Sequence, residues 1–346
     1  MIPLLLIHLI KIGCVIGVML AIVAYTVLAE RKICAWMQDR IGPNRVGPLG
    51  LLQPLADGLK FAFKEDVLPH HVNKVYFTLA PVISMVPALI TIAVVPWGSQ
   101  LMIPGLAQPV KCVIADLNVG ILFVFAIASL GVYGIVLAGW SSNSKYPFLG
   151  GIRSSAQMIS YEVCLGLSVV PVFMQVGSLN LTKVVEYQYQ AHHTWLALCQ
   201  PLSCFIFIVS AFAETNRLPF DLPEAEQELV GGYHTEYSSM KFAMFFMGEY
   251  AAMFVASALM VTLFFGGWSL PFAPFNASAH TLGVGLAHIG IFLAKVCLFL
   301  FFYIWVRWTI PRFRYDQLMA LGWKIFIPLT LLNILISGVV LAVMNK

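Results

Sequence analysis

Three glutamates of this 346-residue chain lie in or at the end of long apolar stretches. Glu162 and Glu249 each lie about two helical turns inside such a stretch, and Glu214 directly follows the end of another. A charged side chain at the centre of a membrane helix costs roughly 2.5–3.5 kcal/mol, and shallower positions cost less. Three acids at similar depth predict a proton relay that faces the interior of a helix bundle. The alternative is a set of structural ion pairs with nearby bases, namely Arg153, Arg217 and Lys241.

A dense run of carboxylates follows Glu214. Its four members are Asp221, Glu224, Glu226 and Glu228, and two prolines stiffen the run. An acidic run is ordinarily a solvated loop, and that alternative stays open. Because this run joins two apolar stretches that carry glutamates, it also predicts an acidic funnel. The funnel would lead from Glu224 and Glu226 to the three membrane glutamates.

The loop between the first two apolar stretches is the longest in the chain. Arg31 and Arg40 lie near its start, before a segment rich in Gly and Pro that predicts turns. Residues 51–64 then place apolar side chains at helical spacing, which predicts an amphipathic helix in the plane of the membrane interface. This helix is either a surface anchor or a lid over a cavity, with Asp57 facing inward.

The elements that must position these side chains are membrane spans. The chain is 60% hydrophobic and only 10% charged, whereas about 25% of residues are charged in soluble domains. A span needs roughly 20 apolar residues as a helix. Eight stretches qualify, at 4–29, 75–95, 117–140, 156–176, 195–213, 242–265, 286–306 and 325–343. The sequence therefore predicts an all-α integral membrane protein, a single polytopic domain over residues 1–346 with about eight transmembrane helices and the amphipathic helix.

The positive charges set the orientation. Of the 20 lysines and arginines, only Lys111, Lys183 and Lys346 fall in the even-numbered loops or at the C-terminus. By the positive-inside rule the odd-numbered loops are cytoplasmic and both termini lie on the opposite side. Lys295 lies within a span, as a relay base, a counterion for a neighbouring subunit or a structural partner.

Several function classes are disfavoured. A net charge of +4 without a basic patch argues against nucleic-acid binding. The seven cysteines form no C-x-x-C pair, so no zinc or iron–sulfur site is predicted in this chain. No nucleotide-binding glycine motif is present either.

Six segments resemble one family. They are 29–32, 42–66, 115–118, 139–146, 213–250 and 311–317. Together they resemble the quinone-tunnel membrane subunit of proton-pumping NADH:quinone oxidoreductase, respiratory complex I, in order over nearly the whole chain. The loops near 102–113 and 183–194 carry no motif of that family.

The resemblance implies a membrane subunit that forms a tunnel for ubiquinone under the redox arm. It implies that Arg31, Arg40 and Asp57 line the polar part of this tunnel and that Phe246 and Met247 border its entrance. It also implies a proton path that begins at Asp57, Glu162, Glu214, Glu224, Glu226 and Glu249. NADH, FMN and the iron–sulfur clusters would be bound by partner subunits, so this chain would carry no redox centre. The overall pattern favours a bacterial inner membrane over a mitochondrial one.

Three alternatives remain at this point. One is the homologous membrane subunit of a hydrogenase-type ion-pumping complex, which the full first loop disfavours. Another is a stand-alone ion transporter, which the absence of a visible internal repeat and the clustering of acids on one side disfavour. The last is a pure scaffold without a relay.

Overall fold

The computed structural model describes residues 2–104, 108–190, 194–222, 230–271 and 278–344, and these are almost entirely helical. The α-helices are α1 (Ile2–Met37), α2 (Gln53–Phe63), α3 (Lys74–Thr91), α4 (Gly120–Ala128), α5 (Leu130–Ser141), α6 (Lys145–Val176), α7 (Leu181–Gln190), α8 (Leu196–Cys199), α9 (Pro201–Glu214), α11 (Ser239–Phe264), α12 (Leu282–Thr309), α13 (Tyr315–Ala320) and α14 (Ile327–Met344). The shorter elements are the 3₁₀ turns η1 (Pro48–Gly50), η2 (Ile92–Val94) and η3 (Gly232–His234), the π-helical turn η4 (Leu321–Phe326), and the antiparallel strands β1 (Gln100–Leu101) and β2 (Val110–Lys111).

Seven helical segments among the described residues are long and apolar enough to cross a membrane. They are Leu6–Met37, Lys74–Val94, Gly120–Ser141, Lys145–Val176, Ser239–Phe264, Leu282–Thr309 and Tyr315–Met344. The predicted all-α integral membrane class is confirmed.

The predicted span at 195–213 is interrupted. Its residues form the short helix α8, a break at Gln200, and then α9, which has 14 residues. Pro201 explains the break, because proline has no N–H to donate into a preceding turn and is favoured at the start of a helix. A helix of this length extends about 21 Å, shorter than the roughly 30 Å hydrocarbon core.

Two other helices are longer than the apolar stretches that predict them. The first helix continues past residue 29 to Met37, and α6 begins at Lys145 rather than at 156. Charged residues end a hydrophobic run without ending a helix, because most of them have a good helix propensity. The extension of α1 places Glu30 inside the helix.

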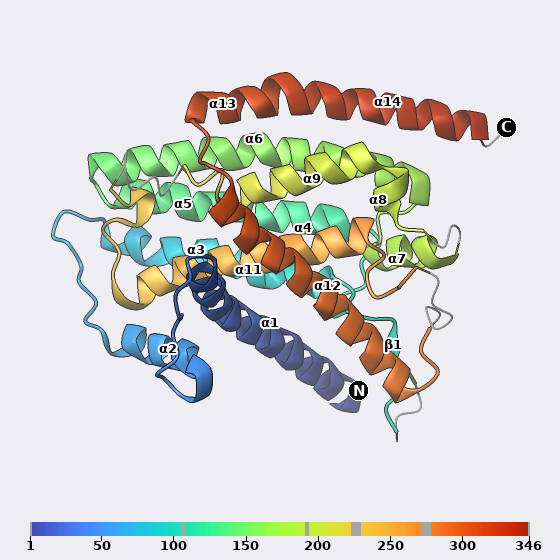
Figure 1. Ribbon diagram of the computed structural model, residues 1–346, viewed down its shortest axis with the longest axis horizontal. Helices are drawn as coiled ribbons and strands as arrows, with labels where there is room; N and C mark the ends of the chain where they lie inside the picture. The colour runs from blue at the N-terminus through green and yellow to red at the C-terminus, as the bar shows by residue number, and fades with distance from the viewer. Residues whose placement is uncertain (1, 105–107, 191–193, 223–229, 272–277, 345–346) are drawn as a thin grey trace.

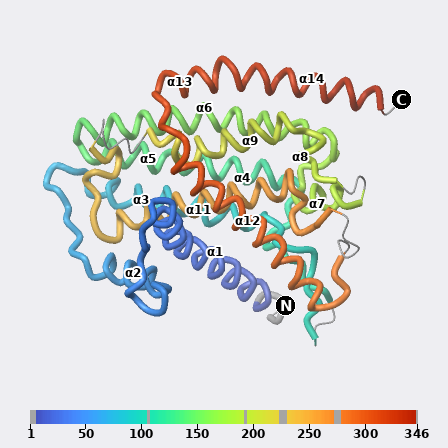
Figure 2. The backbone as a smooth tube through the Cα atoms, viewed as in Figure 1, coloured from blue at the N-terminus to red at the C-terminus, as the bar shows by residue number. Residues whose placement is uncertain are grey.

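The long helices pack into a bundle with two oblique helices across it. Figures 1 and 2 show α6 and α9 side by side, with α14 along the outer edge next to α6. Helices α3 and α5 pack against each other and against α11 and α6, respectively. Helices α1 and α12 run obliquely in front and contact α11.

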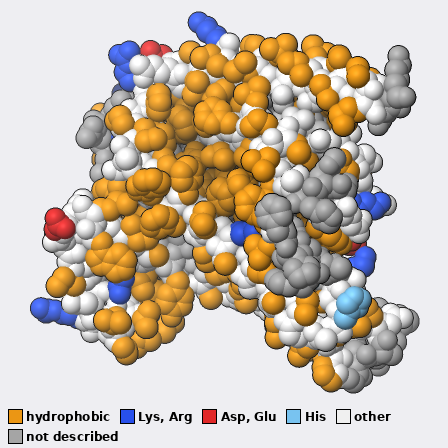
Figure 3. Space-filling model, turned by 45° about the vertical axis from the view of Figure 1, so that its right-hand side comes forward, with side chains coloured by type: hydrophobic (Ala, Val, Ile, Leu, Met, Phe, Trp, Pro, Cys, Tyr) orange, Lys and Arg blue, Asp and Glu red, His pale blue; other side chains and the backbone are white. Residues whose placement is uncertain are grey.

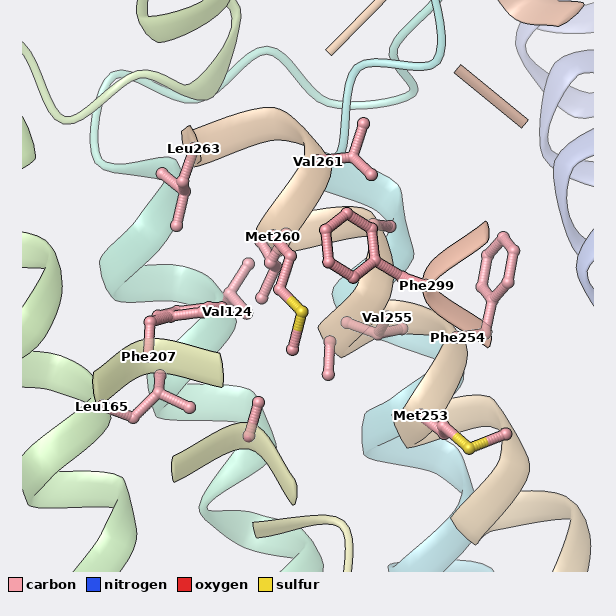
Figure 4. Close-up of a cluster of buried hydrophobic side chains, with 14 of the residues drawn as sticks. Val124, Leu165, Phe207, Met253, Phe254, Val255, Met260, Val261, Leu263 and Phe299 are labelled. Atoms are coloured by element: carbon pink, nitrogen blue, oxygen red, sulfur yellow. The ribbon is translucent and has the colours of Figure 1, made fainter. Parts of the chain in front are cut away.

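The core gathers around α11, most of which is buried. Figure 4 shows its Met260 and Leu263 near Val124 of α4 and Phe207 of α9. The outer surface is also largely apolar, and Figure 3 shows few charged side chains on the face that it presents. An apolar exterior of this kind is the surface expected where lipid surrounds a protein.

Helix α2 stands apart from the bundle, with its apolar side outward. Leu55, Leu59 and Phe63 are all exposed. Its C-terminal end is tied to α11, because the Ser239 hydroxyl lies 2.8 Å from the carbonyl oxygen of Lys64. This arrangement agrees with the predicted amphipathic helix at the membrane interface.

Candidate functional site

A cavity of about 100 Å³ lies among α3, α4, α5, α6, α9 and α11. Most of the side chains that line it are apolar or small. Two carboxylates line it as well, Glu214 of α9 and Glu249 of α11, together with the polar side chains of Thr215 and Asn216. The structure therefore brings together two of the three membrane glutamates that the sequence singles out.

Glu214 is the last residue of α9. Its carboxylate makes no hydrogen bond or ion pair with another residue that the structure describes. The third glutamate, Glu162 on α6, lies close enough to Glu214 for the two charges to repel each other. Glu162 itself does not line the cavity that Glu214 and Glu249 share.

Glu249 belongs to a buried cluster of charges centred on Arg217. The Nε atom of Arg217 lies 2.7 Å from Oε1 of Glu249, and its Nη1 lies 3.4 Å from Oε1 of Glu30. The guanidinium also lies over the ring of Tyr250, with 4.1 Å to the ring centroid. Arg307 of α12 forms a second ion pair with Glu30.

This cluster balances its charges. Glu30 accepts a hydrogen bond of 2.5 Å from the Tyr250 hydroxyl, so its two oxygens are both used. Two arginines face two glutamates in a site where Arg217 is 6% exposed and Glu30 likewise 6%. Buried charges persist when they are paired in this way. Glu249 therefore forms an ion pair with Arg217, one of the bases that the ion-pair alternative names.

A further pair joins the acidic loop to the segment after α12. Asp221 Oδ2 lies 3.1 Å from Nη2 of Arg312. Burial, and next the charge of Glu249, raise the pKa of Asp221 to about 6, and three arginines partly oppose this shift. Asp221 can therefore change its protonation near neutral pH.

The first loop places Arg31 and Asp57 together. Nη1 of Arg31 lies 2.7 Å from Oδ2 of Asp57, and Gln53 donates to the other oxygen at 3.1 Å. Because the Arg31 side chain is 46% exposed, this pair is screened by solvent. Arg40 is exposed and hydrogen-bonds Gln38.

An aromatic cluster lies at the start of α11, next to α2. The Phe246 ring is 4.7 Å from that of Phe242 and 6.0 Å from that of His234, and Phe61 of α2 packs on Phe242 at 6.3 Å. Burial lowers the pKa of His234 to about 4, so its ring is neutral at physiological pH. Met247, next to Phe246, is partly buried.

Two of the predicted relay residues, Glu224 and Glu226, lie outside the described residues. Lys295 takes a structural position instead of a place beside the acids. Its ammonium donates to the carbonyl oxygens of Phe265, Gly267 and Ser269 at 2.7, 3.0 and 2.5 Å. Unpaired carbonyls at a helix C-terminus attract a cation, which explains a lysine at this depth.

Glu30 and its partner Arg307 are the residues that reasoning from the sequence missed. The apolar run ends at residue 29, so the sequence predicts that Glu30 is the first residue of a charged loop. A usable signal was the helix period: Thr26 follows Val23 by three residues and Glu30 follows Thr26 by four, which predicts one helix face. Val23 and Thr26 are both buried, as Glu30 is.

Within the described part of the chain, no cluster of three or more His, Cys, Asp or Glu could hold a metal ion. The fold and the site define a polytopic membrane protein with two glutamates on the wall of a cavity between its helices. The sequence model of a family described as NADH dehydrogenase matches residues 10–338. The chain belongs to this NADH dehydrogenase family.

Its relatives are similar over nearly their whole length. An H-type subunit of NADH-quinone oxidoreductase from Cytophaga hutchinsonii is 50% identical, over 94% of this chain and 93% of the relative. An H-type subunit of the same enzyme from Koribacter versatilis is 51% identical over 98% of both chains. NADH-quinone oxidoreductase subunit 8 of Rhodothermus marinus is 51% identical over 96% of both.

Proposed function

We propose that this chain is the membrane subunit of respiratory complex I that forms the access tunnel for ubiquinone and couples its reduction to proton translocation. The names of the relatives, which are subunits of NADH-quinone oxidoreductase, support the assignment to that complex. The same names favour it over the hydrogenase-type alternative.

The cavity that Glu214 and Glu249 share carries the proton-coupling part of the proposal. A cavity of about 100 Å³ with polar groups on its wall can hold water. Glu249 is paired with Arg217, whereas Glu214 faces the cavity beside the charge of Glu162. A proton can then move between carboxylates through water, and the relay would comprise Asp57, Glu162, Glu214, Glu224, Glu226 and Glu249.

The quinone part of the proposal rests on α2 and the start of α11. Arg31 and Arg40 would stabilise the reduced headgroup next to Asp57, and Phe246 and Met247 would border the entrance of the isoprenoid tail. Reduction of a quinone to a quinol takes two electrons, supplied by the partner subunits, and two protons. The charge that appears during this reaction would shift the protonation of Asp57 and of the acidic loop, and so drive the relay.

The remaining parts of the proposal concern the surroundings. NADH, FMN and the iron–sulfur clusters would belong to the partner subunits of the peripheral arm, and this chain would contribute no redox centre. Small membrane subunits and lipid would cover its sides. It would lie in a bacterial inner membrane with both termini in the periplasm, since the lysines and arginines concentrate in the odd-numbered loops.

Replacement of Glu214 by Gln in the intact complex tests the relay. In proteoliposomes, we expect Glu214→Gln to reduce NADH-driven proton uptake into the vesicle lumen strongly, because an amide cannot carry the proton. The matched control is Glu65→Gln, because Glu65 is an exposed glutamate away from the cavity. If the Glu214 variant reduces quinone and pumps protons as the control does, the relay is wrong. Proton transport by this chain without the redox subunits would favour the stand-alone transporter.

A further inference from the structure

The amide of Gln157 is the polar group on α6 that binds the turn after α9. Gln157 is fully buried, at 0% exposure. Its Nε2 donates to the carbonyl oxygens of Ala213 at 2.8 Å and Phe220 at 2.7 Å, and lies 3.2 Å from Oδ1 of Asn216. Burial of an amide N–H is unfavourable unless it is hydrogen-bonded, and these bonds satisfy the buried amide nitrogen of Gln157.

The two carbonyls lie on either side of Arg217 in the chain. Ala213 belongs to the last turn of α9, and Phe220 follows Arg217 by three residues. Within this segment, the Arg217 amide donates to the carbonyl of Phe212 at 3.2 Å, and the Phe220 amide donates to the carbonyl of Arg217 at 2.8 Å. One side-chain amide therefore holds both ends of the segment that carries Arg217.

A second side chain of α6 contacts the same turn, which follows α9. Asn216 has a positive φ of 51°, which is uncommon for a residue other than glycine. Its Nδ2 donates to the Ser154 hydroxyl at 3.2 Å, one helical turn from Gln157 on α6. Helix α6 thus fixes both the backbone of the turn and the side chain at its tightest point.

The position of this turn decides what Arg217 can reach. Its guanidinium must lie between Glu249 and Glu30, which come from two other helices, α11 and α1. We propose that Gln157 is a positioning residue, which sets Arg217 between Glu30 and Glu249 and Glu214 at the wall of the cavity. The consequence for proton transfer rests on the function proposed above, whereas the placement of Arg217 does not.

The variant Gln157→Met tests the placement directly, because methionine has a similar length and shape but no donor. A density map of the purified complex that carries this variant is expected to show the turn shifted and the Arg217 guanidinium separated from Glu249. A map with Arg217 still on Glu249 and Glu30 would overturn the inference.

Gln188 supplies the matched control. It is also a buried glutamine, 2% exposed, and its Nε2 donates to the carbonyl oxygens of Thr262 at 3.1 Å and Leu263 at 3.4 Å near the C-terminal end of α11. We expect Gln157→Met and Gln188→Met to accelerate thermal inactivation to a similar degree. Only Gln157→Met is expected to lower quinone-reductase turnover per assembled complex. The decrease should be roughly tenfold, because the loss of two hydrogen bonds would let the turn that carries Arg217 shift.

The two proposals fail in different ways. If Glu214→Gln pumps protons like its control Glu65→Gln, while Arg217 moves and turnover falls in Gln157→Met, the relay is wrong and the positioning role holds. If Glu214→Gln stops pumping while Gln157→Met turns over like Gln188→Met, the positioning role is wrong and the relay holds.

A milder variant decides the question if Gln157→Met does not assemble. Ser154→Ala removes only the hydroxyl that accepts from Asn216. Its control is Ser168→Ala, because the buried Ser168 hydroxyl donates to Leu165 within α6 itself. We expect turnover about two- to fivefold lower in Ser154→Ala than in Ser168→Ala. Equal turnover in the two would overturn the inference.

Discussion

Glu30 is the acid whose loss should disturb the buried cluster most. It pairs with Arg217 at 3.4 Å and with Arg307, and its side chain is 8% exposed. Two unit charges 3.4 Å apart attract by about 5 kcal/mol at an effective dielectric constant of 20. Part of this is offset, because the variant no longer has to desolvate a carboxylate. Removal of one partner of a buried pair typically costs about 3–5 kcal/mol, which we expect for Glu30→Gln.

The measurement is the rate of thermal inactivation of the purified complex, since a multisubunit assembly unfolds irreversibly. Glutamine keeps the shape of Glu30 and can still accept from Tyr250, so the variant isolates the charge. The double variant Glu30→Gln/Arg307→Met should recover part of the loss, because it also removes an arginine left without its acid. Two results together would refute this reasoning. Glu30→Gln would be inactivated at the same rate as the exposed control Glu65→Gln, and the double variant would recover no stability.

Three further outcomes are expected. In the folded protein Asp221 holds its proton up to about pH 6, above its ordinary pKa of 3.8, so its ionisation lowers stability as pH rises from about 4 to 6. Thermal inactivation of Asp221→Asn measured from pH 4 to 7 should lack this component, and an unchanged pH profile would contradict the assignment. Lys295→Met should destabilise by about 1.5–3 kcal/mol, through loss of bonds to the end of α11, without altering protons moved per NADH. A changed proton stoichiometry in Lys295→Met would instead support the alternative that Lys295 is a relay base. Arg31→Met should raise the KM for ubiquinone about tenfold while stability changes by less than about 1 kcal/mol, because its pair with Asp57 is partly exposed. An unchanged KM would contradict the proposal that Arg31 lines the tunnel.

Apolar periodicity and length sufficed to predict the helices and the membrane class. The amphipathic α2 could be predicted because its apolar residues repeat with the helix period, and they face outward in the structure. The interruption at Gln200 and the extension of α1 were not predicted. Hydropathy reports where a chain is apolar, whereas a helix ends where backbone hydrogen bonding ends.

The sequence by itself also determined that Glu162, Glu214 and Glu249 lie in or at the end of apolar stretches, where a carboxylate is unfavourable. Only the tertiary structure decided which partners they have. It paired Glu249 with Arg217, left Glu214 at the cavity, and introduced Glu30 and Gln157 from helices distant in the chain. These contacts join residues whose separation in sequence carries no periodic signal. Their partners are set by how helices cross, and that depends on packing of the whole bundle.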